Sequence, residues 1–116
     1  MGDGFLASFH STQLAVRCAI DMQRAFEALE DVHDERIRIR VGINAGEPIT
    51  DGDAIYGNSV ETASDLGKAA KGGEILVSLV VRELVAGKGF QFEPAAGVGK
   101  GETQCFQVVW KDAVAL

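Results

Sequence analysis

The side chains that could do chemistry in this sequence are a few charged residues that do not form a complete catalytic set. Asp3 stands between Gly2 and Gly4, and a short carboxylate in so tight a turn can approach a cation bound to a phosphate. Aspartate between glycines also favours a turn without any ligand. A divalent ion needs several oxygen ligands, so a lone carboxylate holds it weakly. Asp3 is therefore a candidate metal ligand that needs partners.

Other charged positions are also open to a simpler interpretation. Glu61 and Asp65 lie four residues apart in a segment with helical periodicity, which predicts both carboxylates on one helical face. A solvated acidic face is the simpler interpretation of this pair. Lys100 lies in the glycine-rich GVGKGE, which lacks the Walker pattern, and a plain exposed lysine is the simpler interpretation. His10 and His33 are isolated and suggest no ligand pair or catalytic triad.

Composition excludes several classes of protein. The 116 residues carry a net charge of −6 and are 47% apolar. This charge argues against binding to nucleic acid or to an anionic membrane, but it leaves a nucleotide site open. No apolar segment approaches the ~20 residues of a membrane span, and no signal peptide is evident, so we expect a cytoplasmic protein. Cys18 and Cys105 lie in apolar patterns and predict two buried free thiols.

Strands and helices that alternate along the chain must position the charged residues. Apolar residues at helical spacing predict a helix that begins at Ser11 or Thr12 and includes Leu29, and two further helices over residues 58–70 and 79–85. Alternating or continuous apolar runs predict strands over 5–9, 36–43 and 74–78, a short strand after Pro48, and a closing hairpin from 90–94 and 103–110. Residues 50–57 are turn-rich. This order favours α/β or α+β with a mixed sheet.

Four segments in this order resemble the class III adenylate and guanylate cyclases. They are GDGFLASF, IRVGINAGEPI, AIYGNSVETASDL followed by GGEILVS, and VGKGETQCFQVV. The resemblance implies an α+β fold, an α/β sandwich of the ferredoxin-like palm type, with a mixed sheet and helices on one face. It implies one partial domain over residues 1–116, because the family's first strand, which carries an aspartate, its two helices and the first strand of the hairpin have no counterpart here.

The resemblance also assigns roles to particular positions. It makes Asp3 one of two aspartates that bind Mg²⁺ or Mn²⁺, the other belonging to the absent first strand. Glu61 and Asp65 occupy the positions of an asparagine and an arginine that orient the ribose and stabilise the transferring phosphate. Carboxylates repel that phosphate, so no catalytic residue of this pair is intact. Without the second aspartate, we expect this chain alone to bind the metal weakly.

Nucleotide-binding positions follow from the same resemblance. Ala54 falls where adenylate cyclases often carry an aspartate that reads adenine, and Asp53 is adjacent to it. Ile55 could line the base pocket through its backbone. Gly57 and Asn58 match the turn into the helix. Lys100, the fifth position in this set, resembles a lysine that reaches the polyphosphate from a mobile hairpin.

The function implied is cyclisation of a purine nucleoside triphosphate, ATP or GTP, to a 3′,5′-cyclic nucleotide with release of pyrophosphate. We expect weak or absent activity in this chain, in a bacterial signalling protein. We also expect a homodimer or a pairing with another cyclase-like chain, because two palms of the family share their sites. The alternative is a non-catalytic pseudo-cyclase that serves as a dimerisation or nucleotide-binding regulatory module.

Overall fold

A computed structural model describes residues 4, 6–33, 38–47, 49–52, 54–99 and 101–111, with the backbone alone for residues 30–33 and 55. The elements follow the order α1 (Thr12–His33), β1 (Val41–Ile43), β2 (Ile49–Asp51), β3 (Ala54–Tyr56), α2 (Asn58–Ala69), β4 (Ile75–Ser78), α3 (Leu79–Leu84), β5 (Phe92–Val98) and β6 (Thr103–Val108). The three predicted helices, the buried strand and the closing hairpin are confirmed. None of the helices in these ranges has the length and apolar character that a membrane crossing requires.

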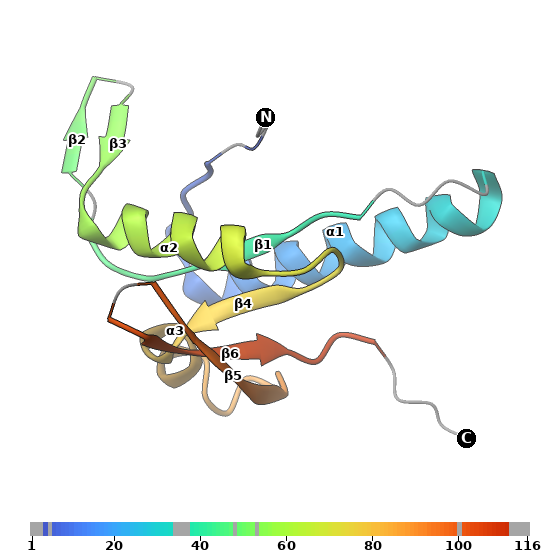
Figure 1. Ribbon diagram of the computed structural model, residues 1–116. Helices are drawn as coiled ribbons and strands as arrows, with labels where there is room; N and C mark the ends of the chain where they lie inside the picture. The colour runs from blue at the N-terminus through green and yellow to red at the C-terminus, as the bar shows by residue number, and fades with distance from the viewer. Residues whose placement is uncertain are drawn as a thin grey trace.

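A four-stranded mixed sheet forms the centre of the fold. Its strand order is β1-β4-β6-β5, with β1 parallel to β4 and the other two pairings antiparallel. The second sheet is the β2–β3 hairpin, which projects away from the rest of the molecule (Figure 1). The α+β class and the mixed sheet are therefore confirmed.

Helices cover both faces of the sheet, and the prediction of helices on one face is wrong. On one face, α1 and α3 pack with Ile75 and Val77 of β4. On the other face, Leu66 of α2 packs with Leu76 of β4 and Cys105 of β6. The physical reason is that all four residues of β4 are buried, and a strand that is apolar on both faces needs cover on both.

Two local predictions also differ from the structure. Residues 6–9 form no strand, and Leu6 and Phe9 stay 53% and 47% exposed, because no described strand lies alongside them to pair with. The strand expected over 36–43 is assigned only over Val41–Ile43, with 34–37 outside the described residues. The short strand expected after Pro48 is confirmed as β2, but the turn-rich stretch also contains β3, which pairs with β2 so that Thr50 lies opposite Ile55 around the turn at Gly52.

Neither cysteine forms a disulfide, but only one of the two thiols is fully buried. The Cys105 thiol donates a hydrogen bond to the Ala96 carbonyl over 3.1 Å, and burial raises the pKa of this thiol. Cys18 is half-buried on α1, so the prediction of two buried thiols holds for Cys105 alone. The thiol that reagents can reach is therefore that of Cys18.

Helix α2 approaches the sheet closely at two glycines, Gly42 of β1 and Gly67 of α2. A Cβ added at Gly42 would overlap the Gly67 nitrogen and the Ala63 carbonyl oxygen, and would lie 2.8 Å from the Leu66 carbonyl carbon. All of these atoms are backbone atoms, which cannot move aside as a flexible side chain can. The absence of a side chain at Gly42 thus sets how near α2 lies to the sheet.

We predict that Gly42→Ala lowers the free energy of unfolding by about 1–3 kcal/mol, the usual cost of overpacking a core. Urea unfolding followed by circular dichroism measures this change. Gly101→Ala is the control, because a Cβ there would meet nothing within 4 Å. Equal stability of the two variants would contradict the close-approach argument.

Candidate functional site

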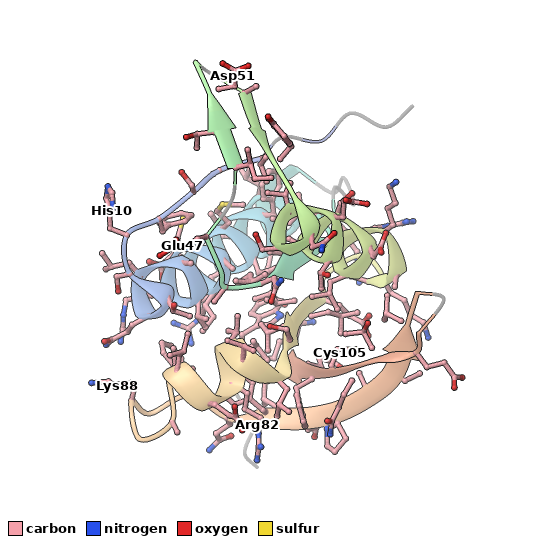
Figure 2. All side chains as sticks on the ribbon, turned by 90° about the vertical axis from the view of Figure 1, so that its left-hand side faces the viewer. His10, Glu47, Asp51, Arg82, Lys88 and Cys105 are labelled. Carbon is pink, nitrogen blue, oxygen red and sulfur yellow. The ribbon has the colours of Figure 1, made fainter. Side chains whose placement is uncertain are left out.

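The candidate site lies where the β2–β3 hairpin runs into the first turn of α2. Figure 2 shows the hairpin standing out from the body with Asp51 at its tip. β3 ends at Tyr56, Gly57 turns the chain, and α2 begins at Asn58. The Gly57 backbone has a φ of 120°, a conformation that side chains rarely adopt, so this sharp entry depends on glycine.

Four predicted nucleotide-binding positions come together in this segment. Ala54 is exposed and pairs with Asp51 next to the turn at the tip of the hairpin, and the Ile55 backbone pairs with Thr50. Gly57 is half-buried, and the exposed Asn58 follows it as the first residue of α2. The segment is therefore one continuous edge, from hairpin to helix.

The first turn of α2 has backbone N–H groups without side-chain caps. No side chain of the N-cap residue Gly57 is available to accept from them, and its carbonyl accepts from Val60 and Glu61 over 3.1 and 3.0 Å. A helix N-terminus of this kind weakly favours an anion. Glu61 already supplies a negative charge within this turn, which suits the helix dipole but repels a phosphate.

Glu61 and Asp65 both lie exposed on α2, as their spacing predicts. Within the described ranges, neither carboxylate forms an ion pair. A Cβ added at Gly99 would lie 3.6 Å from Asp65 Oδ2, so Asp65 faces the turn between β5 and β6. The structure thus brings the acidic face of α2 next to that turn.

Three predicted residues, Asp3, Asp53 and Lys100, lie outside the described residues. The metal role of Asp3 and the phosphate role of Lys100 stay predictions. Among the residues that the structure does describe, no group of three or more His, Cys, Asp or Glu could hold a metal ion. Glu61 and Asp65 supply at most two carboxylates, so the described residues alone do not fit a Mg²⁺ or Mn²⁺ site.

Asn44 is a positioning residue that the sequence reasoning missed. It follows β1 directly, and its side-chain amide donates a hydrogen bond to the Ser59 carbonyl over 3.1 Å. Beside it, a Cβ added at Gly46 would lie 2.8 Å from the Ser59 Cβ, so the loop after β1 packs tightly on the start of α2. The signal available in the sequence was an asparagine directly after a half-buried strand.

The fold combines a mixed sheet that has helices on both faces with a β2–β3 hairpin that leads into α2 beside the β5–β6 turn. These features define the class as a nucleotide-cyclase type of α+β domain. The family described as "Adenylate and Guanylate cyclase catalytic domain" matches residues 2–109. The chain belongs to this family.

Individual relatives agree with this assignment. The crystal structure of an adenylate/guanylate cyclase/hydrolase from Silicibacter pomeroyi is 31% identical, with a TM-score of 0.83 over 94% of this chain and 69% of that one. The guanylate cyclase domain of RhGC from Catenaria anguillulae, solved in complex with GTP, is 28% identical, with a TM-score of 0.67 over 84% of this chain and 59% of that one. The putative adenylate cyclase 3 of Rhizobium meliloti is 34% identical over 89 residues, 75% of this chain.

The chain spans a small part of the curated relatives that it matches. It covers 15% of the Rhizobium meliloti protein and 28% of an uncharacterized Mycobacterium tuberculosis protein to which it is 31% identical. What those whole proteins do is therefore not transferred to this chain by likeness alone.

We predict that Asn44→Asp destabilises the protein more than Asn44→Ala does. The alanine variant loses one hydrogen bond, which costs about 1 kcal/mol of unfolding free energy, whereas the aspartate points a carboxylate at the Ser59 carbonyl. Urea unfolding ranks the variants, and amide exchange of the first turn of α2 locates the change. If both variants match the parent protein in stability and exchange, Asn44 does not position α2.

Proposed function

We propose that the chain contributes to a nucleotide cyclase unit and is weak or inactive as a cyclase by itself. The family reaction joins the ribose 3′ oxygen to the α-phosphate of ATP or GTP and releases pyrophosphate. The unit would belong to a bacterial signalling protein, and the Silicibacter, Rhizobium and Mycobacterium relatives support a bacterial setting.

A single observation carries the proposed inactivity: Glu61 and Asp65 are both exposed on the face of α2 where the family resemblance expects an asparagine and an arginine. Charge that develops on the transferring phosphate needs donors or cations that are already in place. Loss of such a cation in phosphoryl transfer costs roughly 10³-fold or more in rate. Two carboxylates in its place add repulsion to that loss.

The remaining parts of the site support nucleotide contact rather than turnover. The edge from Ala54 to Asn58 would meet the base and ribose, and Lys100 would reach the polyphosphate. Mg²⁺ or Mn²⁺ would neutralise the phosphates, with Asp3 as a ligand beside carboxylates from elsewhere. The neighbours solved with GTP and with ATPαS support a purine nucleotide, and a neighbour described as dimeric supports pairing with a second palm.

We predict no cyclic product above background when the purified chain is incubated with Mn²⁺ and ATP or GTP. Reverse-phase chromatography of the nucleotides, calibrated with cyclic AMP and cyclic GMP, measures this directly. An active full-length cyclase serves as the positive control. Clear turnover by the chain would show that Glu61 and Asp65 do not prevent the reaction.

We predict that the double change Glu61→Asn and Asp65→Arg raises affinity for Mn²⁺–GTP or Mn²⁺–ATP by about tenfold or more, because one positive charge replaces two negative ones near the phosphates. Isothermal titration calorimetry measures the dissociation constants. Glu83→Asn with Glu93→Arg is the matched control, because it alters net charge equally at exposed positions away from α2. Equal gains in both double variants would mean that the effect is not local to α2.

A further inference from the structure

Helix α1 has a second apolar face in addition to the one that packs on the sheet. Val16, Ala19 and Gln23 are buried against the rest of the molecule. A separate row of apolar side chains, here named the α1 stripe, lies beside that buried face. Its members are Leu14, Cys18, Met22, Ala25 and Leu29.

Solvent reaches this stripe along most of its length. Leu14 and Leu29 at its ends are 58% and 46% exposed, Ala25 is exposed, and Cys18 and Met22 are half-buried. The stripe lines a shallow groove that also includes Phe9, itself 47% exposed. Successive spacings of three or four residues keep its members on one side of the helix. Figure 1 shows that the C-terminal end of α1 reaches past the strands, where a partner could approach it.

The charges that border the stripe are self-complementary. Arg17 and Asp21 are exposed along one border, one helical turn apart, and both line the groove. The Arg17 guanidinium lies 5.4 Å from the centre of the Phe90 ring, a contact that holds it at this border. The opposite border carries Ala15 and Phe26 and has no charge among the side chains that the structure describes.

We propose that the α1 stripe is a docking surface for the same stripe of a second copy of this chain, with the two helices antiparallel. An antiparallel two-fold pair brings like borders together, so Arg17 of each copy meets Asp21 of the other. A parallel pair would set this border against the uncharged one and leave both charges unmatched.

The sizes of the stripe residues fit the same arrangement. With the two-fold axis between residues 19 and 20, Leu14 of one copy lies opposite Ala25 of the other. Cys18 lies one residue from direct opposition to Met22, whose flexible thioether adapts to an irregular gap. Large side chains therefore face small ones across the pair, as close packing of two helices requires.

Sedimentation velocity over low to high micromolar concentrations tests the surface. We expect a monomer–dimer equilibrium in which Leu14→Glu raises the dissociation constant by about tenfold or more, because a charge replaces a leucine that the dimer would bury. Leu84→Glu is the control, since Leu84 is 56% exposed on α3, outside the stripe. A clean monomer at high micromolar concentration, or a dimer that Leu14→Glu leaves unchanged, would overturn the proposal.

A charge swap tests the orientation. Arg17→Asp and Asp21→Arg should each weaken the dimer several-fold, and the two together should restore it, because the reciprocal pairs re-form with opposite signs. Single variants that leave the dimer dissociation constant unchanged would overturn the antiparallel pairing. A double variant that dimerises no more tightly than the single variants would overturn it too. Circular dichroism confirms that each variant is folded.

Cys18 gives an independent measure of orientation. In the proposed register the two Cys18 residues are offset by three residues, about 4–5 Å along the helix axis, across axes about 8–10 Å apart. A short bismaleimide should therefore join the two Cys18 thiols, whereas mild oxidation should not. Cys105 is buried and should not react with either reagent. Ready formation of a Cys18 disulfide in the dimer would instead indicate a parallel pair and overturn the proposal.

Discussion

The contact of α2 with the sheet at Gly42 and Gly67 is the constraint on which the rest of the structure depends. Only a residue without a side chain at Gly42 lets the helix backbone lie this close to β1. That closeness buries Leu66 against Leu76 and Cys105, and so completes the hydrophobic core between α2 and its face of the sheet. It also fixes the first turn of α2 relative to the loop after β1, where Asn44 holds Ser59. Packing therefore determines the position of the candidate site.

The same rigid support holds the negative charge of α2 in a fixed position. An exposed carboxylate on a loose segment can swing away from a phosphate, but Glu61 and Asp65 stand on a helix whose opposite side is buried. Their negative charge therefore stays near the hairpin edge and the β5–β6 turn. The fold of this family can persist while the charge of the outer face of α2 changes, because burial selects the inner face of α2 and leaves the outer face free to change.

Periodicity predicted most of the elements, and its failures have identifiable causes. Ser11 was one of two candidate caps for α1, and its hydroxyl does accept from Leu14 N over 3.2 Å. The strand β3 was missed because a three-residue strand in a turn-rich stretch shows too little alternation. The cover on both faces was missed although Ile75, Leu76 and Val77 form a continuous apolar run, whose side chains alternate between the two faces of the sheet. Gly42 and Gly67 lie too far apart in sequence for a pattern to pair them, and the segment 54–58 was found through family resemblance rather than periodicity.

The two candidate surfaces lie on opposite faces of the sheet, and this separates their roles. α1 packs on the face that Ile75 and Val77 form, whereas α2 packs on the face of Leu76. A partner on the outer side of α1 would leave the hairpin edge and the acidic face of α2 open. Pairing through the α1 stripe is therefore compatible with a second palm or a nucleotide at the α2 face. Such a pair would bring two α2 faces into one assembly.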